Sequence, residues 1–350
     1  MTRWLDVPET RLATIDQARH VLAGAAHVVL ATHVNADGDG AGSQAAAAAW
    51  LLATGRRCSI INPTPFPESY TFLLPEREVL AEYGTEAANE ALDQADAFLV
   101  LDTAEPSRLG KLVRHFGDRP VVILDHHPVS DTVLRGTALQ DPTACATGEL
   151  VYDIVRRDLG PDAAWPDAAV IGIYTAIVSD TGSFRFANTS SRAHAIAADL
   201  IARGVDPEYV YRRVFASVPL RRIEILRAAL ATLEVDPVLP LSWISIPPEV
   251  SRTLNPGAED VEGIVEYARS IQGTEIAILF RETADGATKV SFRSSGDADV
   301  NALARRFGGG GHAKASGAII PRPLRKATGI VLDAAREVLR AYGAERAPEP

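Results

Sequence analysis

Cysteine is scarce in this sequence, and features that mark exported or membrane proteins are missing. The 350 residues include only Cys58 and Cys145, which form neither a CxxC pair nor a disulfide framework. The N-terminal stretch MTRWLDVPET has no basic segment followed by an apolar one, so we expect no signal peptide. The longest apolar run, around Ala45–Ala53, is too short to span a bilayer, and we therefore expect a cytoplasmic protein with no membrane partner.

An excess of positive charge is also missing. The formal net charge is −10, which argues against a broad electrostatic surface for long duplex DNA. A local basic groove that holds a short strand or a nucleotide stays open. Hydrophobic residues make up 47% of the chain, enough for packed cores, and 350 residues exceed one typical domain, so we expect two domains.

The first half of the chain alternates short apolar runs with helical patterns. Each run is continuously apolar, as expected for a strand buried on both faces of a sheet. The predicted strands are Ala26–Thr32, Arg57–Asn62, Ala97–Asp102 and Pro120–Asp125, with helical patterns at Gly42–Thr54 and Glu86–Gln94. This alternation predicts a doubly wound, mainly parallel α/β sheet.

The second half is first helical and then mixed. Helices are predicted at 147–158, 167–179, 190–203 and 206–233, strands at 243–246, 275–282 and 289–295, and further helices at 259–272, 299–307 and 325–342. The segment EVDPVLP (residues 234–240) interrupts the helical pattern with two prolines. We therefore predict an N-terminal domain with a helical extension over 1–233, a linker over 234–240 and a smaller C-terminal α/β domain over 241–350.

Acidic and imidazole side chains follow three of the four predicted N-terminal strands. They are His33, Asp37 and Asp39 after the first strand, Asp102 at the end of the third, Asp125, His126 and His127 at the end of the fourth, and Asp180 after a later apolar helix. Because ligands bind at the carboxyl ends of strands in an open parallel sheet, we expect these side chains to converge. So many carboxylates would repel one another unless a cation lay between them. Oxygen and imidazole ligands without thiolate suit Mn, Fe, Zn or Co, so a divalent metal site is predicted.

The Asp37–Gly40 segment has three other interpretations. An isolated segment of this kind is commonly an ordinary turn. An EF-hand loop would need a bidentate Glu at its twelfth position, where Ala46 stands. A dinucleotide-binding loop would place Asp37 and Asp39 against a pyrophosphate, and the glycine spacing is wrong for it. None of the three explains why two other strands end in acidic residues as well.

The sequence resembles the DHH phosphoesterase family, and within it the DHH–DHHA1 members that act on short oligoribonucleotides and 3′-phosphoadenosine 5′-phosphate. Five ordered motifs carry the resemblance over nearly the whole chain: HVNADGDGAGS, LDTAEPSRLG, LDHHP, SDTGSFRFANT and FGGGGHAKASG. The family often has proline before the first aspartate, where Ala36 stands here; this changes loop stiffness and not ligand chemistry. The resemblance implies an active-site cleft between the two domains.

The resemblance also implies two divalent ions, usually manganese, and their ligands. It assigns His33, Asp37 and Asp102 to the first ion and Asp39, Asp102, His126 and Asp180 to the second, with Asp102 bridging. Two ions roughly 3.5–4 Å apart activate a water and stabilise an in-line displacement at phosphorus. We expect Asp102 to matter most, because its loss would unseat both ions.

Two residues of the DHH run are expected to act without binding an ion. His127 cannot easily bind the same ion as its neighbour, so it contacts phosphate or protonates the leaving oxygen. A packed histidine is the alternative interpretation. Asp125 is expected to orient an imidazole. Together with Asp102, these two residues form the predicted catalytic set.

The C-terminal motif FGGGGHAKASG and the strand end before it supply predicted substrate contacts. They are Arg293, Ser294, Gly309, Gly310, Gly311 and His312. Glycines let backbone N–H groups approach an anion closely, and arginine offers a planar fork for phosphate. The motif is no Walker A sequence, because no glycine precedes Lys314 and alanine follows it. By resemblance this domain grips the nucleotide; a flexible hairpin connection is the alternative.

Further contacts are predicted in the N-terminal domain. Tyr70 and Phe72 lie in a proline-rich loop, where they stack on a base or pack against another subunit. Arg108, close after Asp102, and Arg185 neutralise phosphate or are solvated surface residues. The resemblance allows a homodimer, for which the sequence shows no interface.

We therefore expect a manganese-dependent phosphoesterase that releases 5′-mononucleotides from short single-stranded RNAs and dephosphorylates 3′-phosphoadenosine 5′-phosphate. Hydrolysis of cyclic dinucleotides or their linear products is the alternative within the family. Its pyrophosphatases are not expected to carry this glycine–histidine motif, and its longer-strand DNA exonucleases carry extra nucleic-acid-binding modules. The non-enzymatic alternatives are a nucleotide sensor, which would show degenerate metal ligands, and a structural metalloprotein, which would not need the glycine motif.

Overall fold

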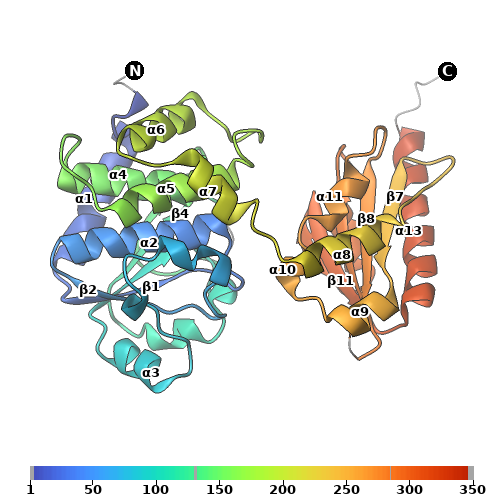
Figure 1. Ribbon diagram of the computed structural model, residues 1–350, viewed down its shortest axis with the longest axis horizontal. Coiled ribbons are helices and arrows are strands. Elements are labelled where there is room, and N and C mark those ends of the chain that lie inside the picture. The colour runs from blue at the N-terminus through green and yellow to red at the C-terminus, as the bar shows by residue number, and fades with distance from the viewer. Residues whose placement is uncertain (1–3, 130–131, 284, 346–350) are drawn as a thin grey trace. The chain divides into compact units, whose positions relative to one another are not determined.

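The computed structural model describes residues 4–129, 132–283 and 285–345 (Figure 1). Its contacts divide the chain into two units, one up to Ser217 and one from Val218 onward, which we call the N-terminal unit and the C-terminal unit. Each unit has its own sheet, with a hydrophobic core on each face of that sheet. Across the described ranges, no helix combines the length and the apolar character needed to cross a membrane.

The N-terminal unit is built on a five-stranded parallel sheet in the order β2-β1-β3-β4-β5. The strands are β1 (His27–Ala31), β2 (Arg57–Ile60), β3 (Ala97–Leu101), β4 (Val121–Asp125) and β5 (Thr137–Gln140). Every residue of β1, β3 and β4 is buried, which explains their continuous apolar sequences. The predicted parallel α/β sheet is confirmed, and β5 is an edge strand that was not predicted.

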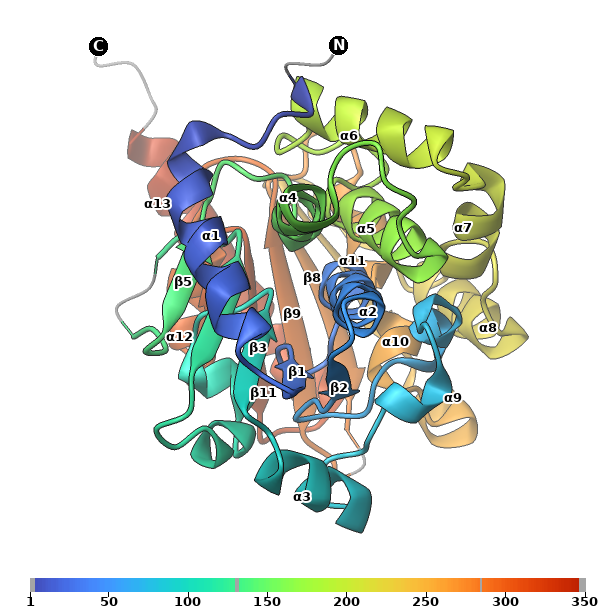
Figure 2. The same ribbon diagram turned by 90° about the vertical axis from the view of Figure 1, so that its left-hand side faces the viewer.

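Helices cover both faces of this sheet. They are α1 (Glu9–Ala23), α2 (Gly38–Ala53), α3 (Glu86–Asp93), α4 (Thr147–Leu159), α5 (Asp167–Asp180), α6 (Ser191–Ala202) and α7 (Pro207–Val214). Val28 and Leu30 of β1 belong to the core that includes α2, α4 and α5, whereas Val29 and Ala31 belong to the core that includes α3. Figures 1 and 2 accordingly show α3 on the opposite side of the sheet from α2 and α5.

The C-terminal unit contains a six-stranded mixed sheet in the order β10-β11-β9-β8-β7-β6. The strands are β6 (Glu234–Val235), β7 (Leu241–Ile246), β8 (Ile276–Glu282), β9 (Thr288–Ser294), β10 (Gly310–His312) and β11 (Ala315–Ile320). Its helices are α8 (Leu220–Leu230), α9 (Pro248–Leu254), α10 (Ala258–Val261), α11 (Ile264–Arg269), α12 (Val300–Arg305) and α13 (Leu324–Glu345). One core includes α8 and α11, and a second core on the other face includes α12 and α13. The predicted smaller α/β domain thus has a mixed sheet.

The predicted domain boundary differs from the division in the structure. The continuous helix predicted over 206–233 is split into α7 and α8, because Pro219 at the start of α8 disfavours a helical residue before it. α8 packs against β7 and α10 and belongs to the C-terminal unit, so the division falls after Ser217. The predicted linker over 234–240 instead contains β6, which pairs with β7. Its prolines therefore lie in a connection inside the C-terminal unit.

Glycines account for two smaller differences in the C-terminal unit. The helix predicted over 259–272 is divided into α10 and α11 at Gly263, whose φ of +79° does not continue a right-handed helix. The glycine run that was predicted as a loop contains β10, which pairs antiparallel with β11. The motif therefore contains all of β10 and the part of β11 that pairs with it.

Candidate metal centre

The strand order places the predicted site where the sheet connections diverge. β1 lies between β2 and β3, so the chain leaves β1 and β3 toward opposite sides and opens a crevice at their carboxyl ends. His33 follows β1, and Asp102 follows β3 directly. Asp102 has a φ of +61°, a left-handed conformation that is uncommon outside glycine and that clusters at functional sites.

The first cluster consists of His33, Asp37 and Asp102. His33 Nε2 lies 3.2 Å from Asp102 Oδ2 and 3.8 Å from Asp37 Oδ2. His33 Nδ1 lies 2.8 Å from the carbonyl oxygen of Val34, so Nδ1–H donates there and Nε2 faces the carboxylates. Asp37 caps α2 with its other oxygen, Oδ1, which accepts two backbone N–H groups at 3.0 Å each. This cap starts α2 earlier than predicted and holds Asp37 beside His33.

The second cluster consists of Asp39, His126 and Asp180. His126 Nε2 lies 3.6 Å from Asp39 Oδ2 and 3.7 Å from Asp180 Oδ2. Asp39 lies in the first turn of α2, and Asp180 is the last residue of α5. These helices approach closely at Gly42 and Gly172, since a Cβ on Gly42 would lie 2.5 Å from the carbonyl oxygen of Gly172. The close crossing of α2 and α5 brings the two carboxylates together.

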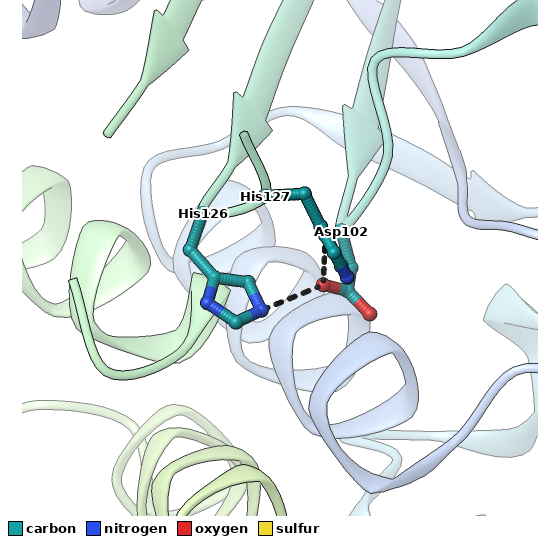
Figure 3. Close-up of side chains that lie close together, drawn as sticks. All are labelled: Asp102, His126 and His127. Atoms are coloured by element: carbon teal, nitrogen blue, oxygen red, sulfur yellow. Dashed lines mark ion pairs between the residues drawn. The ribbon is translucent and has the colours of Figure 1, made fainter. Parts of the chain in front are cut away.

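Asp102 joins the two clusters, because each of its carboxylate oxygens faces a different histidine. Oδ2 lies 3.2 Å from His33 Nε2, whereas Oδ1 lies 3.6 Å from His126 Nε2. Figure 3 shows Asp102 beside both His126 and His127. The residue is only 1% exposed. A buried carboxylate with both oxygens presented in this way can bridge two cations.

His127 differs from His126 in its contacts and its exposure. Its Nδ1 lies 2.8 Å from Asp125 Oδ1 and 3.7 Å from Asp102 Oδ1. The other oxygen of Asp125 accepts a hydrogen bond from Gln140 Nε2 at 3.2 Å. The side chain of His127 is 38% exposed, against 12% for His126. Asp125 thus holds the ring of His127 while part of it stays accessible.

Burial and mutual repulsion raise the proton affinity of two carboxylates. Burial, together with the charges of Asp102 and Asp180, raises the pKa of Asp39 well above its usual value. Burial likewise raises the pKa of Asp180 to about 6. Burial alone would also raise the pKa of Asp102, but the hydrogen bond from His33 and the nearby imidazoles lower it below its usual value. A divalent cation would relieve both the burial cost and the repulsion.

The donor set fits two divalent cations. With metal–ligand bonds of about 2.1 Å, ligand atoms on one ion lie about 3–3.5 Å apart. The nitrogen–oxygen distances within the two clusters and across Asp102 are 3.2–3.8 Å. In each cluster the three ligand atoms lie within 4.8 Å of one another. Carboxylate oxygen with imidazole nitrogen and no thiolate suits manganese, iron or zinc.

Several hydrogen-bond donors around the carboxylates were not predicted. Thr147, the first residue of α4, donates its backbone N–H to Asp39 Oδ2 at 2.6 Å and its hydroxyl to Asp102 Oδ1 at 3.1 Å. Asn188 Nδ2 donates to Asp180 Oδ2 at 2.9 Å. From the sequence, Thr147 was predicted only to be the first residue of a helix. The sequence contains no sign of a contact across 108 positions.

Two of the substrate contacts predicted in the N-terminal unit lie near the clusters. A Cβ added to Gly38, the first residue of α2, would lie 3.0 Å from Tyr70 Oη. Tyr70 therefore lies beside the start of α2. The backbone carbonyl oxygen of Arg108 accepts the N–H of Val34 at 2.8 Å, so Arg108 lies beside the loop that carries His33. Arg185 instead donates to a backbone carbonyl of its own loop, and Phe72 packs edge-to-face on a tyrosine of α7.

The β9 strand and the β10–β11 hairpin bring the C-terminal contacts together. Arg293 pairs in register with Ala315, and its Nε lies 3.2 Å from Glu266 Oε1. His312 is exposed at the end of β10. Ser294 is 3% exposed, and its hydroxyl lies 3.5 Å from a backbone carbonyl oxygen, so this hydroxyl is buried. Contact of these residues with substrate stays a prediction.

Two glycines of the motif have a reason in packing. A Cβ on Gly309 would lie 2.1 Å from the carbonyl oxygen of Gly317, and one on Gly311, whose φ is +142°, would lie 2.6 Å from that of Ala315. A Cβ on Gly310 would meet open space. The hairpin therefore needs glycine at 309 and 311 whether or not a ligand binds there.

Comparisons with known proteins agree with this geometry. Residues 27–177 match the N-terminal domain of the DHH family, and residues 250–342 match the DHHA1 domain. The chain is 31% identical over 319 residues to the bifunctional oligoribonuclease and PAP phosphatase NrnA of Thermus thermophilus, which covers 90% of this chain and 91% of that protein.

Two solved structures share the fold. An exopolyphosphatase-related protein from Bacteroides fragilis matches 95% of this chain and 96% of its own, with a TM-score of 0.85 and 25% identity. RecJ of Thermus thermophilus, solved in complex with Mn²⁺, matches 98% of this chain and 56% of its own, with a TM-score of 0.51 and 16% identity. With both halves matched and the histidine–carboxylate clusters in place, the chain belongs to the DHH family of metal-dependent phosphoesterases and carries a C-terminal DHHA1 domain.

Proposed function

We propose that the protein uses two divalent ions, preferably Mn²⁺, to hydrolyse short oligoribonucleotides to 5′-mononucleotides and to remove the 3′-phosphate of 3′-phosphoadenosine 5′-phosphate. The observation that carries the proposal is Asp102, whose two oxygens face two separate histidine–carboxylate clusters. The similarity to an oligoribonuclease and PAP phosphatase over most of the chain supports this substrate class. The oxygen and imidazole donors are compatible with manganese, and RecJ of Thermus thermophilus, which shares the fold, was solved in complex with Mn²⁺.

The clusters divide into two ligand sets that share one residue. The first ion would be held by His33 Nε2, Asp37 Oδ2 and Asp102 Oδ2, and the second by Asp39 Oδ2, His126 Nε2, Asp180 Oδ2 and Asp102 Oδ1. When bound, two such ions lower the pKa of a water molecule and stabilise the charge that develops at phosphorus. The protein contributes carboxylate oxygens that hydrogen bonds already orient, and those of Asp39 and Asp102 are buried.

One bond type accounts for both reactions. In each substrate the bond that breaks joins phosphorus to a ribose 3′-oxygen, so water adds to phosphorus and the 3′-oxygen leaves with a proton. A 5′-mononucleotide or inorganic phosphate is the other product. A site that accepts either a phosphodiester or a terminal 3′-phosphate therefore needs only one leaving-group arrangement.

His127 is suited to supply the proton for the 3′-oxygen. The hydrogen bond to Asp125 raises the pKa of His127 above its usual value, which favours the imidazolium. Asp125 engages Nδ1, so Nε2–H of the partly exposed ring is the donor available to a substrate. In this role Asp125 orients His127 and stabilises its charge.

The proposal is tested with the purified full chain in Mn²⁺. Hydrolysis of di- to pentaribonucleotides, 3′-phosphoadenosine 5′-phosphate and cyclic dinucleotides is compared by kcat/KM. We expect the first two substrate types to exceed cyclic dinucleotides by at least about tenfold, or about 1.4 kcal/mol. A preference for cyclic dinucleotides would reassign the substrate class.

A variant of one ligand separates the metal mechanism from a contaminating activity. Asp39→Asn should abolish turnover, because it removes a charged ligand. The similar side-chain shape should preserve the fold, which far-ultraviolet circular dichroism checks, although the new amide NH₂ lies opposite a hydrogen-bond donor. Asp16→Asn, which alters a half-exposed ion pair with Arg157, should keep the activity of the unmodified protein. Near-normal turnover by Asp39→Asn would refute the metal assignment.

A further inference from the structure

We propose that Thr147 is a positioning residue that fixes the carboxylates of Asp39 and Asp102 relative to each other. The inference rests on the two-metal function proposed above. Thr147 is fully buried at the start of α4, far from both carboxylates in sequence. It touches neither substrate nor reacting atoms in this role, and acts through the two ligands to which it is bonded.

Thr147 makes one hydrogen bond to each metal cluster. Its backbone N–H donates to Asp39 Oδ2 at 2.6 Å, and its hydroxyl donates to Asp102 Oδ1 at 3.1 Å. A hydroxyl carries a single proton, so this donor is fully used by Asp102. Thr147 is fully buried, so both bonds start from one residue whose surroundings are packed. The two bonds therefore set the distance between the two carboxylates.

The donors around Asp39 select the oxygen that an ion can reach. Oδ1 accepts the backbone N–H of Gly148 at 3.0 Å and the hydroxyl of Ser43 at 3.1 Å. A carboxylate oxygen has about two lone-pair directions, so Oδ1 is saturated, whereas Oδ2 keeps one direction free beside its bond to Thr147. Oδ2 is also the oxygen that lies 3.6 Å from His126 Nε2. The hydrogen bonds thus present one chosen oxygen to the second cluster.

The hydroxyl of Thr147 acts on Asp102 in the same way. It occupies one direction of Oδ1 and leaves the other for an ion beside His126, while Oδ2 faces His33. Without this bond, Oδ1 would be free to rotate toward His126 or His127, which lie 3.6 and 3.7 Å away. Both clusters would be disturbed, because both use Asp102.

Buried ion pairs hold the start of α4 in place. Glu149 Oε2 accepts the backbone N–H of Cys145 at 3.1 Å, which closes the turn around Thr147. Glu149 Oε1 pairs with Arg11 Nη1 at 2.7 Å and with Arg192 Nε at 3.0 Å. These pairs tie α4 to α1 and to α6, so Thr147 donates from a braced position.

Thr147→Val tests the hydroxyl, because valine keeps the shape and the backbone N–H. We expect Mn²⁺ binding to the metal-free protein to weaken by at least about tenfold, since such outer hydrogen bonds commonly contribute 10–100-fold in metal affinity. At saturating Mn²⁺, kcat should fall while KM for a short oligoribonucleotide changes less than about twofold, since the substrate contacts are untouched. Thr147→Ser restores the hydroxyl and should restore both values.

Thr175→Val is the matched control. Thr175 is equally buried, in α5, but its hydroxyl donates to the helix carbonyl of Ile171 at 2.9 Å and contacts no ligand. This variant should bind Mn²⁺ like the unmodified protein. Titration calorimetry and the Mn²⁺ electron paramagnetic resonance spectrum report affinity and number of ions independently of turnover.

Three outcomes would overturn the inference. One is unchanged Mn²⁺ affinity in Thr147→Val, another is a serine variant that does not recover, and a third is equal loss of affinity in Thr175→Val. If the valine variant does not fold, Thr147→Ala removes the same hydroxyl without added methyl groups and is judged by the same measurements. Absence of Mn²⁺ binding or of hydrolysis in the unmodified protein would instead refute the proposed function itself.

Discussion

The two sets of predicted functional residues differ in how firmly the fold holds them. In the N-terminal unit, Asp39 and Asp102 are each 1% exposed and are held by several hydrogen bonds. In the C-terminal unit, His312 is exposed on a hairpin, and Arg293 is paired with Glu266. Burying the two carboxylates lowers the stability of the fold unless a cation binds between them. The exposed histidine and the paired arginine need no ligand to be stable.

This difference shows which geometry is evidence of function. Burying several carboxylates together raises their pKa and opposes folding, so such a cluster needs a compensating ligand. An exposed histidine and a paired arginine need none. The buried carboxylates of the N-terminal unit therefore call for a bound cation, whereas His312 and Arg293 of the C-terminal unit are stable without a ligand.

Removal of the bridging charge should have the largest effect. Asp102→Asn keeps the side-chain shape, and asparagine tolerates the left-handed backbone found there. We expect kcat to fall by more than about 100-fold and both ions to be lost, since even outer hydrogen-bond partners contribute up to about 100-fold. Asp96→Asn, just before β3 at the opposite end of the sheet, is the control and should stay active. Two tightly bound ions in Asp102→Asn would contradict the bridging role.

Protons should compete with the ions at the second cluster. The pKa of Asp180 is about 6 in the metal-free fold and about 3.9 in an unfolded chain. Because the folded value is higher, this group stabilises the metal-free fold most below about pH 4, and that contribution is lost as the pH rises through about 6. Binding of Mn²⁺ displaces the proton, so apparent Mn²⁺ affinity should fall about tenfold per pH unit below about pH 6.

Urea unfolding midpoints with and without Mn²⁺ measure this competition. The stabilisation by Mn²⁺ should increase between about pH 5 and about pH 7. Asp180→Asn removes one of the two carboxylates with a raised pKa in this cluster, the other being Asp39, and should make that increase smaller. A pH dependence of the same size in the variant would exclude Asp180 as its source.

The sequence was sufficient to predict which acidic and imidazole side chains cluster, because the topology forces them together, whereas metal binding by the cluster stays a prediction. Parallel strands place their carboxyl ends at one edge, so residues that follow β1, β3 and β4 must meet once the strands are recognised. His33, Asp102 and His126 are in those positions, and the close crossing of α2 and α5 adds Asp39 and Asp180. The predicted parallel sheet and the metal cluster thus depend on the same few apolar runs.

Other features could not be predicted, because no local pattern encodes them. Thr147 meets Asp39 across 108 positions, and nothing in the sequence around either residue indicates a partner so distant. A single helix was predicted over 206–233, because apolar residues recur at helical spacing on both sides of Pro219. The structure has two helices, α7 and α8, separated just before this proline. In the glycine motif, close strand pairing and a phosphate-binding loop both require glycine, so the sequence does not distinguish between them.

Glycine substitutions separate packing from anion binding in the hairpin. Gly309→Ala places a methyl group 2.1 Å from a backbone carbonyl oxygen, so we expect the free energy of unfolding to fall by about 1–3 kcal/mol. Gly310→Ala meets open space and should change it by less than about 0.5 kcal/mol. Urea unfolding of both variants gives the two values. A raised KM in the stable Gly310→Ala variant would indicate that a ligand approaches the backbone there, and equal stability of both variants would contradict the packing explanation.

Arg293→Ala and His312→Ala decide whether the C-terminal unit contributes to substrate binding. We expect each to raise KM for a short oligoribonucleotide by about tenfold, equivalent to about 1.4 kcal/mol, with little change in Mn²⁺ affinity. Lys289→Ala removes an exposed cation from the same strand and should leave KM unchanged, which controls for loss of general positive charge. If KM is unchanged in both variants, the pairing of Arg293 with Glu266 is structural, and substrate recognition belongs to the N-terminal unit, where Tyr70 and Arg108 lie beside the metal clusters.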